Sequence, residues 1–170
     1  FEANNFIGLT PQINDFRASW SEFFRDCRLK PQFEWISQEN STPSKLLRDF
    51  DRLLGRLEVL FDGPREKPAL LHGDLWGGNS LPLRDGSTAI FDPAVYFGHR
   101  EAELAMTELF GGFSERFYQS YRQSWSLDPG YETRKVLYNL YHILNHYNLF
   151  GDGYAEQAQG MIDRLLAALS

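Results

Sequence analysis

Hydrophobic residues recur at intervals of three and four positions along much of the chain, which is the spacing of one buried helix face. The pattern covers residues 15–28 and, with a stronger contrast between apolar and polar positions, residues 46–61. Thr42 followed by Pro43 predicts the start of the second helix, because threonine can cap a first turn and proline suits the first helical position. The first part of the chain therefore predicts two helices.

The segments beside the first of these helices, residues 1–12 and 29–43, show no sustained period and predict loops. After Arg100 the helical spacing returns and continues to the end of the chain. The capping and helix-breaking signals of this second half are Ser114, Asp128-Pro129 and Gly151-Asp152-Gly153. They predict a helix from Ser114 to about Trp125, a longer helix, and a final helix after the glycine-rich break.

The hydrophobic pattern changes between Gly63 and Gly98, where short apolar segments alternate with turns rich in glycine and aspartate. Asp85-Gly86 separates two of these segments and predicts a β-hairpin. We therefore expect an α+β fold that is mainly helical, with a small irregular β insert in its middle. Polar, glycine-rich segments held by a rigid scaffold are where proteins commonly place their chemistry.

Composition narrows the functional classes. The chain has 170 residues, 42% hydrophobic residues and a net charge of −6, with no run of Lys or Arg, which predicts one globular domain and argues against binding to nucleic acid or an anionic membrane. Cys27 is the single cysteine, so an internal disulfide and a cysteine-based zinc cluster are excluded, and its position predicts a buried core residue. No apolar run approaches ~18 residues, and a cytoplasmic location is expected.

Three polar residues of the insert stand in an order that phosphoryl transfer requires. Asp74 is followed five residues later by Asn79, and Asp92 follows the apolar pair Ile90-Phe91 after the predicted hairpin. Transfer from ATP needs a carboxylate that takes the proton of the acceptor hydroxyl, and oxygen ligands that hold magnesium. Asp74 is therefore the predicted base, and Asn79 and Asp92 are the predicted magnesium ligands.

Glycine-flanked Asp and Asn residues also have other interpretations. Asp and Asn beside glycine can simply be turn residues, and dinuclear metallophosphoesterases carry similar Gly-Asp and Gly-Asn elements but need more histidines than this chain offers. Its four histidines are His72, His99, His142 and His146. His142 and His146 lie one helical turn apart, yet a third zinc ligand is not evident; we expect hydrogen-bonded histidines that can line a pocket. Trp76 lies within the predicted catalytic loop and is expected at the mouth of the substrate site.

At these residues the chain resembles the fructosamine (ketosamine) kinase family. The matching motifs are His72-Gly73-Asp74-Leu75-Trp76-x-Gly78-Asn79, Asp92-Pro93-Ala94-x-Tyr96-x-Gly98-His99-Arg100-Glu101-Ala102, Asn5-x-Ile7-Gly8-x-Thr10-Pro11-Gln12, Glu108-Leu109-Phe110-Gly111-Gly112-Phe113 and Leu137-Tyr138-x-Leu140-Tyr141-His142-x-Leu144-Asn145-His146. The similarity spans nearly the whole chain. The tryptophan of the loop separates this family from the related aminoglycoside and choline kinases, which share the wider His-Gly-Asp pattern.

The resemblance implies an ATP- and Mg²⁺-dependent kinase that phosphorylates a sugar hydroxyl of ketosamines, on small amines or on glycated protein lysines, and so promotes deglycation. It implies Asp74 as the base and Asn79 and Asp92 as magnesium ligands. Trp76 and His146 are the candidate substrate-binding residues. His72 and Glu103 are expected to brace the catalytic loop, although Glu103 stands where many members of the family have aspartate.

The same resemblance implies a fold: the large, C-terminal lobe of the protein-kinase-like, aminoglycoside phosphotransferase-like fold. Its predicted parts are loop and helices over 1–62, catalytic loop and metal-binding hairpin over 69–98, and a helical remainder over 99–170. A complete member of the family begins with a small β-rich lobe that contacts the nucleotide, and no such lobe fits into residues 1–68.

We therefore expect the C-terminal catalytic lobe of a longer protein, with the small lobe as its missing partner and with little or no turnover by the 170 residues alone. Two alternatives stay open. One is an aminoglycoside- or choline-kinase-like phosphotransferase, and the other is a non-catalytic fragment or binding module.

Overall fold

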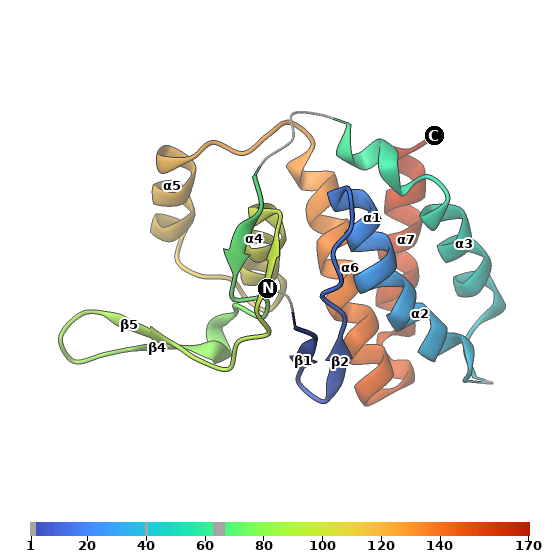
Figure 1. Cartoon of the computed structure of the whole chain (residues 1–170), viewed down its shortest axis with the longest axis horizontal. Coiled ribbons are helices and arrows are strands. Elements are labelled where there is room, and N and C mark those ends of the chain that lie inside the picture. The colour runs from blue at the N-terminus through green and yellow to red at the C-terminus, as the bar shows by residue number, and fades with distance from the viewer. Residues whose placement is uncertain (1–2, 40, 63–66) are drawn as a thin grey trace.

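The computed structural model describes residues 3–39, 41–62 and 67–170, as a body of helices with small two-stranded sheets beside it (Figure 1). The helices are α1 (Trp20–Phe24), α2 (Lys30–Ser37), α3 (Ser44–Leu54), α4 (Arg100–Leu109), α5 (Glu115–Ser124), α6 (Tyr131–Phe150) and α7 (Ala155–Ala168). The strands are β1 (Asn5–Ile7), β2 (Thr10–Gln12), β3 (Ala69–Leu71), β4 (Ser80–Pro82), β5 (Thr88–Ile90) and β6 (Tyr96–Gly98). They form three antiparallel pairs, β1–β2, β3–β6 and β4–β5. The fold is thus α+β and mainly helical, as predicted.

The core is built around α6, which contacts α2, α4 and α7. Leu137, Leu140 and Leu144 follow its apolar spacing and are completely buried. The polar link from α6 to α4 is also buried: the Arg134 guanidinium donates to both carboxylate oxygens of Glu101, over 2.7 and 2.9 Å. A charge inside a protein is tolerated when it is paired and hydrogen-bonded, so this ion pair fixes α4 against the core.

The first twelve residues were predicted to be a loop, and this is wrong for the residues that the structure describes. Strands β1 and β2 pair in antiparallel register, with Phe6 opposite Pro11. Three-residue strands are too short for a visible alternation of apolar and polar positions, which is why the sequence pattern missed the hairpin. Residues 1–2, with which the predicted loop began, lie outside the described residues.

The predicted loop over 29–43 is also wrong, since α2 occupies most of it. A π-helical turn, Arg25–Leu29, joins α1 to α2. The wider turn shifts the helical register, and the buried face of α2 includes the polar Gln32, so the apolar period appears to stop there. Residue 40, within the same predicted loop, lies outside the described residues.

Helix boundaries differ from the predictions at both early helices. The first helix begins after Ser19, which forms a capping box with Glu22, so residues 15–18 precede it. Thr42 does not cap the second helix; its hydroxyl donates to the carbonyl of Ile36 over 2.7 Å. The second helix ends at Leu54, before Gly55, and a short 3-10 turn covers Leu57–Phe61.

Predictions for the rest of the chain are confirmed in outline. Cys27 is buried. Strands β4 and β5 flank Asp85-Gly86 as the expected hairpin, which extends away from the helical body (Figure 1). Ser114 caps α5. The start of the predicted insert, residues 63–66, lies outside the described residues. No helix among the described residues is both long and apolar enough to cross a membrane.

Candidate active site

The predicted catalytic loop leaves β3 at Leu71 and runs from His72 to Asn79, where the hairpin β4–β5 begins. Gly73 adopts a φ of +84° in this loop. A Cβ at this position would lie 2.1 Å from the carbonyl oxygen of Ala94, a distance that no side chain tolerates. The Ala94 amide also donates to the carbonyl of His72 over 2.8 Å. Glycine at position 73 is therefore required for the close approach of this loop to the segment that follows Asp92.

Asp74 and Asn79 meet inside the loop. The Nδ2 group of Asn79 donates to the Asp74 carboxylate over 3.1 Å and to the Asp74 carbonyl over 2.9 Å. Asp74 is half-buried, and this burial raises the pKa of its carboxyl, while the hydrogen bond from Asn79 partly lowers it. A carboxylate with a raised pKa is better suited to accept a proton than an exposed one. The amide contacts leave the Oδ1 oxygen of Asn79 as the atom able to bind a metal.

Asp92 follows β5 and is exposed. Its φ of +56° makes it the one non-glycine residue with a left-handed backbone in the part of the chain that the structure describes. Such a conformation is uncommon for a residue with a side chain, and aspartate is among the types that adopt it most readily. The Phe91 amide donates to the carbonyl of Asn79 over 3.2 Å, which ties the backbone beside Asp92 to the backbone of Asn79. The two predicted ligands are thus held on neighbouring segments.

The oxygens of Asn79 and Asp92 fit a magnesium ion bound together with a triphosphate. Mg²⁺ prefers hard oxygen ligands and is commonly held by one or two carboxylates plus substrate phosphates, with water completing the shell. The described residues contain no group of three or more His, Cys, Asp or Glu side chains that could hold a metal by themselves. Asn79 and Asp92 thus offer two oxygen donors with which Mg²⁺ is compatible, and an ion held there would need further ligands.

Glu103 of α4 and His72, the first residue of the loop, tie the loop to neighbouring segments. The Glu103 carboxylate accepts from the amides of His72 and Gly73 over 2.8 and 3.0 Å. Burial raises the pKa of Glu103, and these two hydrogen bonds oppose the shift. The ring of His72 reaches the carbonyl of Phe91 through Nε2 over 3.0 Å. Each side chain thus connects the loop to a different element, α4 in one case and the end of β5 in the other.

The two candidate substrate-binding residues are joined by an aromatic side chain that the sequence prediction did not assign to the site. The ring of Phe110, just after α4, lies 5.8 Å from the ring of Trp76 and 5.1 Å from the ring of His146. His146 is close enough to Asp74 to lower its pKa when protonated. The signal for Phe110 was an aromatic residue at a helix end, followed by Gly111-Gly112, where a sharp turn leaves the ring exposed.

His142, one turn before His146, has a different environment. Its ring is buried, and burial lowers its pKa to about 3, so the side chain is neutral near pH 7. Its Nδ1 atom has no hydrogen-bond partner among the described residues. The Nδ1 atom of His146 instead contacts the carbonyl of His142 over 2.7 Å. The two imidazoles are therefore not arranged as a pair, and only His146 reaches the candidate site.

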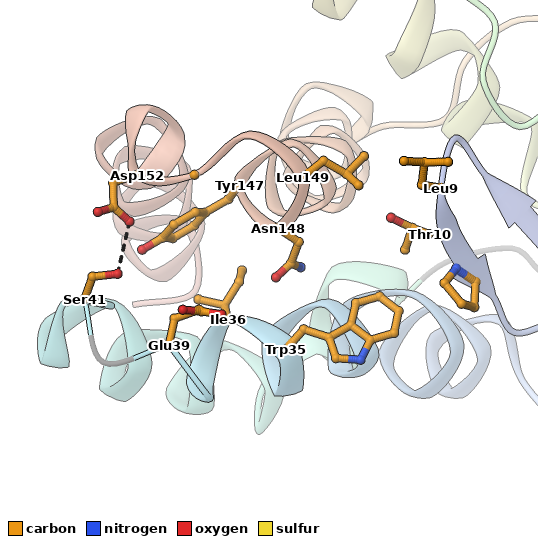
Figure 2. Close-up of a pocket in the computed structure, with 12 residues that line it drawn as sticks. Leu9, Thr10, Trp35, Ile36, Glu39, Ser41, Tyr147, Asn148, Leu149 and Asp152 are labelled. Carbon is orange, nitrogen blue, oxygen red and sulfur yellow. Dashed lines mark hydrogen bonds between the residues drawn. The ribbon is translucent and has the colours of Figure 1, made fainter.

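A cavity of about 480 Å³ lies elsewhere in the molecule, between the turn of β1–β2, the end of α2 and the end of α6 (Figure 2). Trp35 and Leu149 contribute apolar walls, and a hydrogen bond from Ser41 to Asp152 crosses one end. None of the predicted catalytic or metal-binding residues lines this cavity. The candidate chemistry therefore does not take place in it.

The fold and the order of base, amide and carboxylate are typical of phosphotransferases of the kinase type. A family model described as fructosamine kinase matches residues 1–168. The chain belongs to the fructosamine kinase family.

Individual relatives agree with this membership. The chain is 46% identical over 169 residues to a probable ketoamine kinase of Synechocystis, covering 98% of this chain and 55% of that protein. It is 46% identical to a chloroplastic protein-ribulosamine 3-kinase of rice (Oryza sativa subsp. indica), covering 99% of this chain and 49% of the relative. Among solved structures, a Thermobifida fusca protein assigned as a fructosamine-3-kinase superposes with a TM-score of 0.90 at 33% identity, over 98% of this chain and 58% of that one. The chain thus spans about half the length of the relatives that it matches.

Proposed function

We propose that this chain is the catalytic lobe of an ATP- and Mg²⁺-dependent kinase that phosphorylates a sugar hydroxyl of ketosamines. The observation that carries the proposal is the joint placement of Asp74, Asn79 and the segment before Asp92 through three hydrogen bonds. Family membership supports the substrate class, because the relatives are named ketoamine, ribulosamine and ketosamine kinases. The cytoplasmic location stays a prediction.

In this proposal Asp74 accepts the proton of the attacking hydroxyl. The raised pKa of its carboxyl keeps it a competent proton acceptor, and the donated hydrogen bond from Asn79 fixes its orientation. The oxygens of Asn79 and Asp92 would hold Mg²⁺, which would neutralise charge on the transferring phosphoryl group. Glu103 and His72 hold the loop that carries Asp74, so the base and the metal ligands keep a constant separation.

The aromatic residues beside the base suit a sugar joined to a cationic amine. The ring faces of Trp76 and Phe110 offer apolar and cation–π contacts, and the Phe110 ring is next to both the Trp76 ring and the His146 ring. His146 binds its own helix through Nδ1, which leaves Nε2 to contact a sugar hydroxyl. We assign Trp76 and His146 to substrate binding on this ground.

A second lobe is part of the proposal. Four large apolar side chains near the candidate site have at least half of their surface exposed. They are Leu70 (61%), Leu81 (55%), Ile90 (57%) and Phe97 (50%). Leu70 and Phe97 lie opposite each other in the pair β3–β6, and exposed apolar patches often mark an interface. The remaining half of the relatives' length is the natural candidate to cover it and to complete the nucleotide site.

The test is a phosphorylation assay with the full-length protein that contains this chain. Purified enzyme is given ATP, Mg²⁺ and a fructosyl-amine, and ³¹P NMR identifies the phosphorylated sugar carbon. We expect transfer to the fructosyl-amine and none to the matched unglycated amine. Transfer to an aminoglycoside or to choline, with none to the fructosyl-amine, would refute the substrate assignment.

The non-catalytic alternative is decided by a separate measurement on the isolated chain. Calorimetric titration with Mg²⁺ and ATP is expected to show little or no heat of binding, while the full-length protein binds under the same conditions. Equal nucleotide affinity in both proteins would contradict the proposed contribution of the second lobe.

A further inference from the structure

Three amide side chains lie in or just after the hairpin β1–β2, two of them buried and Asn5 partly buried, and none of them belongs to the catalytic loop. Asn5, Gln12 and Asn14, called here the amide cluster, bind one another: the Oδ1 oxygen of Asn5 accepts from Gln12 over 2.9 Å and from Asn14 over 3.0 Å. Gln12 has 2% and Asn14 6% of its surface exposed. Buried amides are costly unless their donors and acceptors are satisfied, so the remaining partners of the cluster are informative.

Two of those partners are the backbone carbonyls of Ala94 and Val95, shortly after the predicted metal ligand Asp92. Gln12 donates its second Nε2 hydrogen to the carbonyl of Ala94 over 2.9 Å. Asn5 donates to the carbonyl of Val95 over 2.8 Å. Both acceptors lie within three residues of Asp92, across more than eighty positions of sequence. The β1–β2 hairpin is thus fastened to the chain segment that leaves the metal site.

The amide cluster also accepts hydrogen bonds from two buried side chains, Arg28 and Tyr141. The guanidinium of Arg28, which is completely buried, donates to Oδ1 of Asn14 over 2.9 Å and lies 4.2 Å from the centre of the Tyr96 ring. The hydroxyl of Tyr141 donates to Oε1 of Gln12 over 3.0 Å, so both ends of the Gln12 amide are engaged. Because a carbonyl at Ala94 demands a donor, the orientation of this amide is determined by its surroundings.

The Asp92 segment needs such restraint. Its left-handed backbone at Asp92 is less favourable than the right-handed or extended alternatives, and it persists only where the surrounding structure holds it. On the loop side, His72 supplies one contact to Phe91 and one to Ala94. On the opposite side, the amide cluster supplies the contacts to Ala94 and Val95. Residues 91–95 are therefore held by hydrogen bonds from the catalytic loop and from the amide cluster.

We propose that Gln12, supported by Asn5, is a positioning residue that sets the geometry of Asp92 for metal binding. Among the described residues, Gln12 forms no hydrogen bond to Asp74, Asn79 or Asp92. It acts through its hydrogen bond to the Ala94 carbonyl. The structural part of this inference stands on the contacts alone. Its consequence for magnesium rests on the proposed function.

The structural part is tested by hydrogen–deuterium exchange on the full-length protein without nucleotide. The variant Gln12→Leu removes both donated hydrogen bonds, and Gln12→Glu keeps the side-chain shape and the contact with Tyr141 while placing an oxygen against the Ala94 carbonyl. Because each lost hydrogen bond changes a local opening equilibrium by about fivefold, exchange over residues 91–98 is expected to accelerate by at least that factor in both variants.

Gln32→Leu is the matched control. Gln32 is another glutamine with 2% of its surface exposed, and its amide binds Asn145 and Asn148 of α6 instead. Its loss is expected to accelerate exchange in α2 and at the end of α6 and to leave residues 91–98 unchanged. Unchanged exchange over 91–98 in the Gln12→Glu variant, or the same pattern in the Gln32 variant, overturns the proposal.

The consequence for magnesium is measured in the phosphorylation assay. We expect Gln12→Glu to raise the Mg²⁺ concentration for half-maximal rate by about fivefold or more, with the KM for the sugar-amine unchanged and Gln32→Leu without effect on either. A uniform fall in rate without a shift in Mg²⁺ dependence contradicts positioning. If the wild-type protein transfers no phosphate at all, the proposed function fails, while the exchange result still decides the structural part.

Discussion

Helix α6 and the insert between β3 and β6 place side chains in opposite ways. Along α6, Leu137, Leu140 and Leu144 are completely buried and follow one regular period. In the insert, Leu81 and Ile90 are more than half exposed, and the backbone depends on positive φ angles and on hydrogen bonds from distant elements. We infer from this difference that the helices supply most of the stability of the described residues, while the insert depends on contacts with α4 and with the hairpin β1–β2.

The largest effect is expected at Asp74 in the insert, where the proposed catalytic carboxylate reduces the stability of the fold. Replacing Asp74 by Asn removes the proposed base, so the rate should fall by about 10²–10⁴ in the phosphorylation assay of the full-length protein. The same variant should melt at a higher temperature at pH 7, because the raised pKa of Asp74 means that folding disfavours its charged form above that pKa.

A general folding defect would lower both the rate and the melting temperature, whereas this variant is expected to lower the rate and raise the melting temperature. Differential scanning calorimetry of the same Asp74→Asn sample supplies the melting temperature. Retained turnover near the wild-type rate would remove Asp74 from the role of base, whatever the thermal result.

The second comparison concerns stability alone. Leu140→Ala creates a cavity against completely buried neighbours in α6 and should lower the free energy of unfolding by about 2–5 kcal/mol. Leu9→Ala, at a leucine of the β1–β2 turn that is 86% exposed, makes the same chemical change and should stay within about 0.5 kcal/mol of wild type. Urea denaturation of both variants checks the pair. Similar losses in the two would mean that burial in this chain is not concentrated around α6.

The same contrast explains what could be predicted from the sequence. The long helices α6 and α7 were predictable because each presents a regularly spaced apolar face to the core, and Ser114 caps α5 as its residue type suggests. The helix α2 was missed because a π-helical turn shifts the register before it and the polar Gln32 occupies its buried face. Periodicity predicts a helix only while the buried face remains apolar and the turn stays regular.

For the candidate site, the order of Asp74, Asn79 and Asp92 was available from the sequence, because phosphoryl transfer demands specific residue types at short spacing. Their roles stay proposals, although the structure brings Asp74 and Asn79 into contact. Phe110 and Gln12 could not be assigned in the same way. Phe110 carries only the weak local signal of an aromatic residue before Gly111-Gly112, and the places of both residues depend on contacts between segments far apart in the chain.

The smallest expected effect is a dependence of stability on pH that originates in the helical core. His142 on α6 is buried, and burial lowers its pKa to about 3, whereas an unfolded histidine titrates near 6.5. The unfolded chain therefore binds one more proton than the folded chain between these two values, so this group reduces stability as the pH falls below about 6.5. By pH 5 the loss should reach about 2 kcal/mol. A His142→Gln variant should lack this decline, and urea denaturation of both proteins at pH 7, 6 and 5 measures the difference. Parallel curves would place the histidine in a more accessible environment than the core around α6 provides.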